Sequence, residues 1–246
     1  MLYSALRRLK SGTSDETNGR HIISIEAAEA CKETDSPNIL DVGAGYGHDL
    51  KAIRELLDQK ARLYAVESYP QSVEHLRSSG VEVCDVNIEN AVLPFADQHF
   101  DVVICNQVLE HTKEIFWVVS ELIRVTKIGG HLIVGVPNLG SLHNRVLLLF
   151  GQQPPAIHVF GPHVRGYTVP GMVDFLERGG YLKVTKVLGG NFYPLPPMLS
   201  RLLSKMLPGL SVSSFYISKR LKDGSFLSVF FSPEASELVD TLYYRG

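Results

Sequence analysis

Cysteine is scarce in this sequence, and the few residues present are poorly placed for cross-linking. Three cysteines, Cys31, Cys84 and Cys105, stand far apart in 246 residues, and no Cys-x-x-Cys pair occurs. An odd number at this spacing excludes a disulfide framework and a cysteine-based zinc site as organising features. Two of the three lie in apolar, strand-like runs, so we expect buried thiols in a reducing compartment.

Long uninterrupted apolar runs are also lacking. The longest candidates, VLLLFGQQPPAIHVF and VLGGNFYPLPPMLS, are broken by glycine and proline, so neither can span a bilayer. The start, MLYSALRRLK, does not read as a secretory leader, because its arginines follow a short apolar stretch. It is either a frayed terminus or a short basic amphipathic helix that rests on a membrane or another subunit. We expect a cytoplasmic protein with at most peripheral membrane contact.

The chain has no excess of positive charge. Lys and Arg number 24 and Asp and Glu number 26, which gives a formal net charge of −2. A balance of this kind argues against nucleic acid as a partner. We expect a monomer or homodimer that acts on a small-molecule or a glycan- or lipid-linked substrate.

What the chain does have is a regular alternation of apolar strand-like runs and amphipathic helical segments. Five strand-like runs, NIL to Val42, RLYAV, VEVCDV, FDVVICN and GGHLIVGVP, alternate with helices at 47–60, 70–78 and 113–126. Further helices are predicted at 21–34, 141–150, 168–178 and 198–206, and further strands at 181–188 and 211–221. Apolar strands separated by amphipathic helices indicate parallel strands covered on both faces. The run at 211–221 alternates well enough to predict an edge strand.

No linker divides the chain into two cores, so we expect a single domain over residues 1–246. Within it, residues 36–137 form the binding core and residues 167–221 complete the sheet. Residues 138–166 form an insertion long enough to act as a lid or substrate loop. The apolar helix near its start is expected to pack as core or lid rather than anchor in a membrane. Residues 222–246 form a peripheral tail, which could add a strand and a helix.

The stretch ILDVGAGYGHDL, residues 39–50, predicts the ligand. A dinucleotide fingerprint, G-x-G-x-x-G, would need its third glycine at position 48, which is His48, whereas the third glycine is Gly47. Asp41 stands at the strand end, where a carboxylate would repel a pyrophosphate. It favours a ligand with cationic character, such as the amino group and sulfonium of S-adenosylmethionine (SAM).

These residues resemble a known family. DVGAGYG is similar to the D/E-x-G-x-G-x-G motif of class I SAM-dependent methyltransferases, and the resemblance covers residues 36–137 strongly and 163–221 loosely. It implies a Rossmann-like, doubly wound α/β fold with helices on both faces. The seven-stranded sheet would be mostly parallel, with an antiparallel C-terminal edge strand. It further implies SAM as cofactor and S-adenosylhomocysteine (SAH) as product.

The resemblance also implies roles for the polar strand ends. Glu67 would accept hydrogen bonds from the ribose hydroxyls, Asp85 would contact the adenine amino group, and Asn106 would begin the loop around methionine and sulfonium. Because ligands of open α/β sheets bind outside the carboxyl ends of the strands, these positions should converge. The implied cofactor-binding residues are Asp41, Gly43, Ala44, Gly45, Tyr46, Gly47, Glu67, Ser68, Asp85, Val86, Asn106, Gln107 and Val108.

His111, in LEHT beside the sulfonium loop, is the candidate general base for a hydroxyl acceptor. The alternative is that His111 caps the next helix or packs under the cofactor. The candidate substrate-binding residues, on the insertion and just after it, are His143, Asn144, His163, Arg165 and Tyr167. Arg165 could bind an anionic group or brace the loop. His143, His158 and His163 fit no compact ligand spacing, so no metal is expected.

The fragments PNLGSLHNR, GQQPP and HVRGYT refine the resemblance. They are similar to a branch of small methyltransferases, of methyltransferase type 11, found with glycan and lipid-linked sugar biosynthesis, and more distantly to ubiquinone-type O-methyltransferases. An oxygen acceptor on a sugar, glycolipid or small metabolite is therefore expected. Two alternatives stay open: a methyltransferase-like module without catalysis that acts as a partner subunit, and a nicotinamide-dependent oxidoreductase, which His48 and Asp41 disfavour.

Overall fold

The computed structural model describes residues 19–231; the basic start and residues 232–246 of the tail lie outside this range. The predicted strands and helices all occur in the predicted order with shifts of a few residues, and the helix at 70–78 and the strands RLYAV and FDVVICN match their predicted ranges. The longer helices are α3 (Arg20–Cys31), α4 (His48–Leu56), α5 (Pro70–Ser78), α6 (Ile115–Val125), α7 (Leu142–Leu149), α8 (Val169–Glu177) and α9 (Pro197–Met206). The strands are β1 (Asn38–Val42), β2 (Arg62–Val66), β3 (Glu82–Cys84), β4 (Phe100–Asn106), β5 (Thr126–Pro137), β6 (Leu182–Gly190) and β7 (Ser213–Arg220). A short helix, α10 (Ser228–Phe231), ends the described chain.

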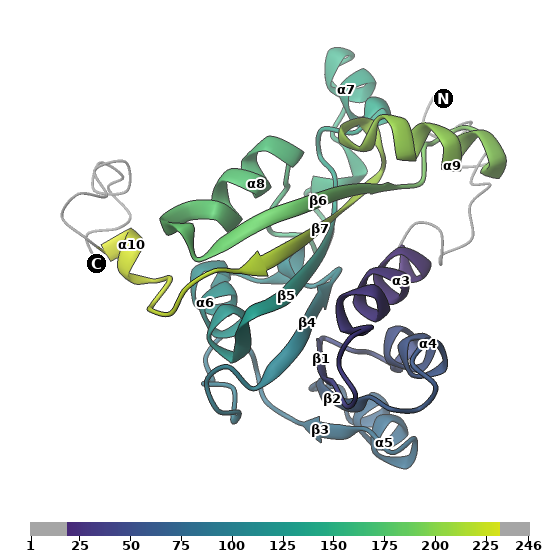
Figure 1. The fold of residues 1–246 in the computed structure, drawn as a ribbon. Coiled ribbons are helices and arrows are strands. Elements are labelled where there is room, and N and C mark those ends of the chain that lie inside the picture. Colours follow the sequence, from purple (N-terminus) through teal and green to yellow (C-terminus); the bar gives the residue numbers. More distant parts are fainter. Residues whose placement is uncertain (1–18, 232–246) are drawn as a thin grey trace.

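The seven strands form one sheet in the order β3-β2-β1-β4-β5-β7-β6 (Figure 1). Strands β1 to β5 pair in parallel, whereas β7 runs antiparallel to both β5 and β6. The predicted fold class is therefore confirmed.

The predicted position of the antiparallel strand is wrong. Strand β7 lies inside the sheet, and β6 forms the edge. The alternation of polar and apolar residues that suggested a solvent-facing side comes from the serines of β7. These serines, Ser213, Ser214 and Ser218, are buried, as are Phe215 and Ile217. Small hydroxyl side chains fit a fully covered strand, so the pattern did not distinguish an inner strand from an edge strand.

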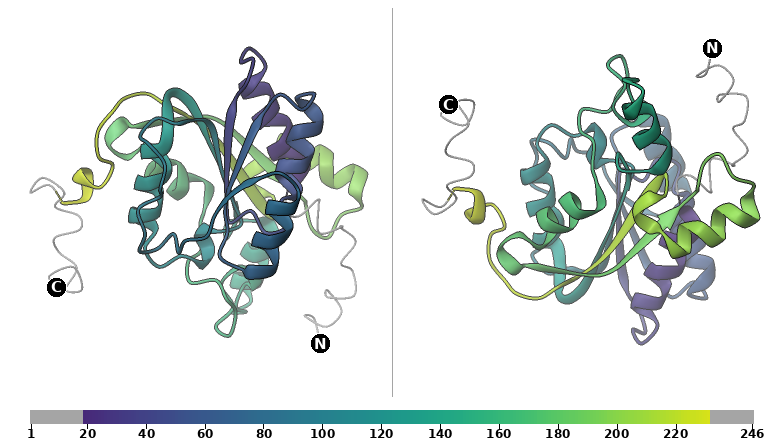
Figure 2. Two further views of the ribbon diagram at one scale, coloured as in Figure 1. Left: turned by 90° about the horizontal axis from the view of Figure 1, so that it is seen from below. Right: turned by 90° about the horizontal axis from the view of Figure 1, so that it is seen from above.

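Helices cover both faces of the sheet, and the two faces separate by the alternation of side chains along each strand. In β1, Ile39 faces a cluster with α3, α4 and α5, whereas Leu40 faces a cluster with α6 and α8. Figure 2 shows the same division from two further sides. Cys31 and Cys105 are buried, Cys84 is half-buried, and all three are free thiols.

The carboxyl ends of β1, β2, β4 and β5 share one edge of the sheet, because these strands are parallel. Strand β6 also ends there, since it is antiparallel to β7, which is antiparallel to β5. Helix α7 follows β5 and α9 follows β6, so both helices lie at this edge, at the top of Figure 1. We call it the carboxyl edge.

The insertion begins as predicted after β5, and its base is closed by an isolated parallel bridge between Asn138 and Tyr167. The sequence predicted that its helix α7 packs as core or lid, and in the structure α7 is not part of the core. Only Asn144 and Leu147 of α7 are buried, while Leu149 is 81% exposed. The apolar residues of α7 are not gathered on one side of the helix, so the helix cannot bury all of them. No helix of residues 19–231 is long and apolar enough to cross a bilayer.

Candidate functional site

The glycine turn after β1 has a left-handed backbone at each of its three glycines. The φ angles are 74° at Gly43, 54° at Gly45 and 71° at Gly47. A Cβ atom on Gly43 would lie 2.4 Å from Cγ2 of Val108, and one on Gly47 would lie 2.5 Å from Cδ2 of Leu76. A Cβ on Gly45 would have no atom within 4 Å. A side chain at Gly43 or Gly47 would therefore overlap Val108 or Leu76. At Gly45 the space beside the backbone is open.

The carboxylate of Glu67, which directly follows β2, is hydrogen-bonded to this turn. Its Oε2 accepts a hydrogen bond from the backbone N–H of Gly45 at 2.7 Å, and its Oε1 accepts from Ser68 and Tyr69 at 2.8 Å each. The carboxylate is half-buried and is held by three donors at the carboxyl edge. It stands between the glycine turn and the segment that follows β2, where the sequence predicted it.

Negative charge is concentrated beneath the turn. Asp41 is 2% exposed and Asp49, on the first turn of α4, is 8% exposed. Burial raises the pKa of Asp41 well above its ordinary value, the nearby carboxylates of Asp49 and Glu67 raise that pKa further, and Arg20 opposes them. The raised pKa favours the protonated form of Asp41 in the absence of a ligand, and a bound cationic group would favour its carboxylate form, whereas a pyrophosphate would be repelled by the carboxylates.

Asp49 is a residue that sequence reasoning missed. An acid in the first turn of a helix is common, because it complements the helix dipole, so its position carried no special signal. In the structure its Oδ2 accepts a hydrogen bond from Nδ2 of Asn106 at 3.2 Å. The contact joins the first turn of α4 to the end of β4 and fixes the side chain of Asn106.

The remaining predicted cofactor residues lie along the same edge. Gln107 has a φ of 56°, and its N–H donates to the carbonyl of Gly135 at 2.8 Å, which turns the chain sharply after β4. Asp85 is exposed just beyond β3, and Val86 packs half-buried against the core. Since β3, β2, β1 and β4 are adjacent in the sheet, the four strand ends form one continuous rim.

The second missed residue is Glu110, in the turn Leu109–His111 after β4. Its side chain is 1% exposed, and neither carboxylate oxygen has a hydrogen-bond partner. Burial raises the pKa of Glu110 to about 7. Its Oε1 lies 4.0 Å from Nε2 of His111. The sequence offered the Leu-Glu-His stretch, but nothing in it showed that the acid would be buried.

His111 pairs with a histidine of the insertion. The rings of His111 and His163 lie 4.8 Å apart, edge to face. Nδ1 of His111 is 3.3 Å from the carbonyl of Pro162, and Nδ1 of His163 is 3.0 Å from that of Ala156. Donation from both Nδ1 atoms to these carbonyls favours the tautomer in which each Nε2 can accept a proton.

Glu110, His111 and His163 place their donor atoms within 4.8 Å of one another, a spacing at which three side chains could surround a metal ion. The group differs from the three histidines of the insertion that were considered in the sequence. A buried acid beside two histidines also suits proton transfer, because carboxyl and imidazole side chains are common general acids and bases.

Two predicted substrate residues hold the insertion in place. Asn144 is buried, and its Nδ2 donates to the carbonyl of Asn138 at 3.0 Å. The hydroxyl of Tyr167 donates to the carbonyl of Leu109 at 2.9 Å. The amide N–H of Asn144 and the hydroxyl of Tyr167 are therefore engaged with the backbone around the site, whereas Oδ1 of Asn144 is buried without a partner.

The other predicted substrate residues are more accessible. His143 is half-buried, its ring lies 5.5 Å from that of Tyr193, and burial lowers the pKa of its imidazole. Arg165 is exposed, and its guanidinium donates to the carbonyl of Lys113 at 3.1 Å. Arg165 therefore lies beside the segment that follows the turn after β4, whereas His143 lies beside the segment that follows β6.

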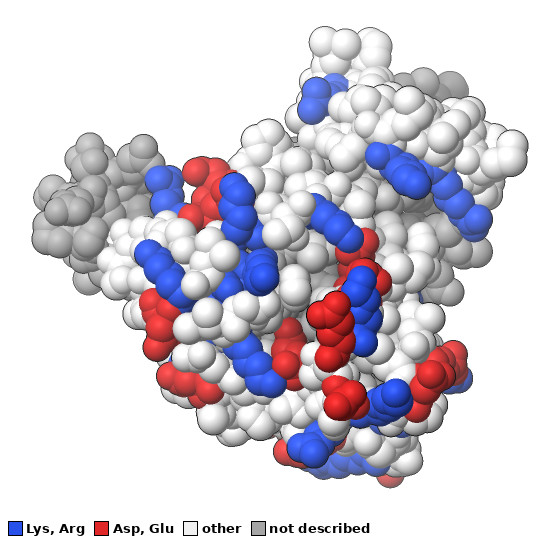
Figure 3. Space-filling view, in the orientation of Figure 1, with Lys and Arg blue, Asp and Glu red and all other residues white. Residues whose placement is uncertain are grey.

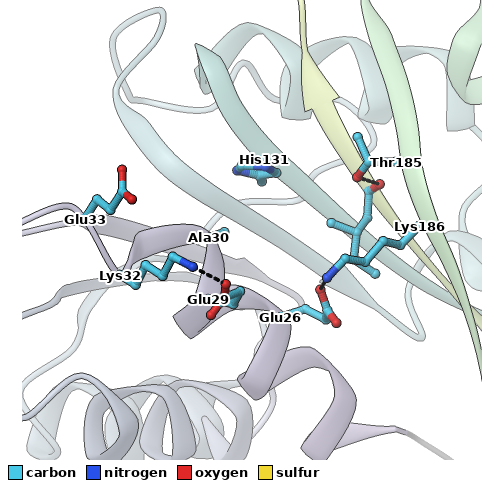
Figure 4. Close-up of a pocket in the computed structure, with 9 residues that line it drawn as sticks. Glu26, Glu29, Ala30, Lys32, Glu33, His131, Thr185 and Lys186 are labelled. Atoms are coloured by element: carbon cyan, nitrogen blue, oxygen red, sulfur yellow. Dashed lines mark hydrogen bonds and ion pairs between the residues drawn. The ribbon is translucent and has the colours of Figure 1, made fainter.

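A separate cavity of about 290 Å³ lies between α3 and the face of β5, β6 and β7 (Figure 4). Both lysines that line it are paired with glutamates, Lys186 with Glu26 at 2.7 Å and Lys32 with Glu29. It shares no residue with the rim of strand ends, so we do not assign it to the site.

Part of the chain is similar to known proteins. Residues 40–134, from β1 to β5, match the family model of a methyltransferase domain. A probable SAM-dependent methyltransferase of Mycolicibacterium smegmatis is 32% identical over 148 residues, which are 60% of this chain and 51% of that protein. The chain spans 17% to 51% of the length of the first three curated relatives that it matches.

Solved structures show the same fold. A SAM-dependent methyltransferase of Thermotoga maritima, described as a possible histamine N-methyltransferase, has a TM-score of 0.54 at 22% identity and covers 82% of this chain and 91% of its own. The cyclase SpnF has a TM-score of 0.58 at 16% identity and covers 82% of each chain. At these identities the likeness concerns the fold and not the reaction.

Proposed function

The chain carries a class I, SAM-dependent methyltransferase domain with SAM as its cofactor, and on this premise we propose that it transfers the methyl group of SAM to a hydroxyl oxygen of its acceptor. The acceptor is a small molecule or a glycan- or lipid-linked compound. The observation that carries the proposal is the acidic cluster beneath an open glycine turn, which suits a ligand that is cationic at its reacting end.

The residues of the rim fit SAM by their chemistry. The open approach at Gly45 admits the ligand to the backbone, and Asp41 and Asp49 supply negative charge for its ammonium and sulfonium groups. The carboxylate of Glu67 has lone pairs that its backbone donors do not use, and these would accept hydrogen bonds from the ribose hydroxyls. Asp85 would accept a hydrogen bond from the adenine amino group. Bound SAM supplies an electrophilic methyl group on a sulfonium.

His111 is the general base of this proposal. Its Nε2 takes the proton of the acceptor hydroxyl while that oxygen bonds to the methyl carbon and the carbon–sulfur electron pair leaves with sulfur, which yields SAH. The nearby carboxylate of Glu110, 4.0 Å from Nε2, stabilises the imidazolium that forms. Glu110 is buried and does not reach the acceptor, so it acts as a positioning residue.

Calorimetric titration with SAH and, separately, with NAD tests the cofactor. We expect SAH to bind and NAD not to bind. Asp85→Ala should weaken SAH binding by about 1–3 kcal/mol through the lost polar contact. Asp35→Ala, which removes an equally exposed acid before β1, is the matched control and should bind as wild type. Binding of NAD, or of neither compound, contradicts the proposal.

The base is tested by His111→Ala, with His158→Ala as control, since His158 is an exposed histidine that lies in the insertion and not in the turn after β4. We expect turnover to fall about a hundredfold or more in the first variant, with SAH affinity nearly unchanged. Equal losses of turnover and affinity would instead assign His111 to packing under the cofactor. SAH binding without turnover on any hydroxyl acceptor would favour the module without catalysis.

A further inference from the structure

Helix α9 buries serines and exposes large apolar side chains, the reverse of a typical surface helix. Its buried residues are Ser200, 4% exposed, and Ser204, 3% exposed. Met198 is 86% exposed, Leu202 is 55% exposed and Met206 is 65% exposed. A surface helix normally buries its apolar stripe and leaves its hydroxyls in water.

The inward direction of the serines follows from close packing against β6. Oγ of Ser200 accepts a hydrogen bond from the N–H of Phe192 at 2.6 Å. A Cβ atom on Gly189 would lie 2.7 Å from the carbonyl oxygen of Ser204. Only small residues fit on both sides of this contact, so α9 cannot rotate to bury its methionines and leucines.

The insertion exposes further large apolar side chains at the same edge of the sheet. At the end of α7, Leu149 is 81% exposed and Phe150 is 65% exposed. In the loop that follows, Val159 is 77% exposed and Phe160 is 94% exposed. We call these side chains and the exposed side of α9 the insertion–α9 surface; Figure 1 shows both helices at the same end of the molecule.

The charge around this surface has one sign. Neither residues 139–173 nor residues 187–222 contain Asp or Glu. Arg145 and Arg165 stand in the insertion, and Arg201 and Lys205 stand on α9. In Figure 3 the upper right of the molecule, over α7 and α9, is white and blue, whereas red side chains lie at the upper left and lower down.

We propose that the insertion–α9 surface docks onto bilayers that contain anionic lipids. Exposed leucine, methionine and phenylalanine side chains can enter the boundary between headgroups and acyl chains, and basic residues attract the lipid phosphates. Phe160, Met198 and Leu149 are exposed over most of their surface and project from three separate segments. Such side chains suit insertion into a lipid surface better than a flat contact with another protein.

The docking surface and the rim of strand ends share the carboxyl edge, so the bound protein would present its site to the membrane. The acceptor would then be an amphiphile whose hydroxyl lies at the headgroup level. This part of the inference rests on the proposed methyl transfer, whereas the docking itself does not.

Cosedimentation of the full chain with vesicles tests the docking. We expect binding to vesicles of equal parts phosphatidylglycerol and phosphatidylcholine and much weaker binding to phosphatidylcholine alone. Leu202→Glu should reduce binding about tenfold or more, while Ile128→Glu, a change of similar exposure near the start of β5, should not. Lys205→Glu should reduce binding about tenfold, while Lys51→Glu on α4 should not.

Wild-type binding by Leu202→Glu and Lys205→Glu, or absence of vesicle binding in every protein, overturns the proposal. Light scattering measures the oligomeric state and so tests whether a second copy of the chain covers the surface. A dimer that Leu202→Glu dissociates, without vesicle binding, would assign the surface to that second copy. SAH calorimetry on the same samples separates the two proposals. Vesicle binding without SAH binding would contradict the methyl transfer and leave the docking in place.

Discussion

Glu110→Gln tests the central electrostatic feature of the site, a buried carboxyl without a hydrogen-bond partner. Burial moves the pKa of Glu110 from 4.5 to about 7. Each pKa unit corresponds to about 1.4 kcal/mol, so this change amounts to about 3 kcal/mol of unfolding free energy. Because the carboxyl is 1% exposed, solvent screening does not reduce this figure substantially.

The sign follows from where the proton is bound. Below about pH 4.5 the carboxyl is protonated in both folded and unfolded chains, so its pKa shift costs nothing there. Between about pH 4.5 and 7 the unfolded chain ionises while the folded chain keeps its proton, and the unfolding free energy falls. Above about pH 7 the full loss of about 3 kcal/mol is present in wild type and absent in Glu110→Gln.

The groups facing Glu110 are known. Cys105 and Tyr167 both have pKa values raised by burial and by the charge of Glu110 itself, so they stay neutral through this window. His111 and His163 also lie beside Glu110, and they are present in both proteins. The difference between wild type and variant therefore reports mainly on Glu110.

The assay is urea unfolding followed by the fluorescence of the single tryptophan, Trp117, at about pH 5 and about pH 8. We expect the unfolding free energy of wild type to drop between the two conditions by about 3 kcal/mol more than that of Glu110→Gln. Glu114→Gln, an exposed acid nearby, should follow wild type. Parallel pH dependences in wild type and Glu110→Gln would refute the reasoning. The same variant should also lose turnover, because it no longer stabilises the imidazolium of His111.

The remaining predictions concern the glycine turn, the acidic cluster and metal. Asp41→Asn should weaken the binding of SAM more than that of SAH, because only SAM carries the sulfonium charge; equal losses in calorimetry would contradict this. Gly43→Ala should lower the unfolding free energy by about 2–4 kcal/mol, through strain at φ 74° and overlap with Val108, and Gly45→Ala by about 1 kcal/mol only. Thermal unfolding compares the two, and equal costs would show that Gly43 does not serve packing. Chelation of divalent metal should leave turnover unchanged; a loss restored by added metal would assign Glu110, His111 and His163 as ligands.

The cofactor half of the molecule could be predicted because local sequence determines it. Positive φ angles demand the three glycines, and the parallel strands bring Glu67, Asp85 and Asn106 to one edge without any knowledge of packing. Glu110 could not be found in this way. Its burial depends on the insertion folding back over the turn after β4, which is a contact between segments about fifty residues apart.

The inner position of β7 and the orientation of α9 escaped sequence reasoning for a related cause. Both depend on small polar residues being buried: serines in β7, and Ser200 and Ser204 in α9. Periodicity arguments place hydroxyl side chains in solvent, whereas close approach to a neighbouring backbone selects them for size. Gly189 in β6 is the partner that makes this selection in α9, and it stands apart from the helix in sequence.

The insertion is joined to the turn after β4 by hydrogen bonds of its own. The N–H of Val164 donates to the carbonyl of Glu110 at 2.7 Å, and the hydroxyl of Tyr167 donates to that of Leu109. The insertion and the turn after β4 are therefore one hydrogen-bonded unit. Residues 138–166 could be replaced by those of a relative in order to change acceptor specificity. The new segment would then not match the turn after β4, to which the present one is hydrogen-bonded. A successful chimera must carry residues 107–112 and 138–167 together.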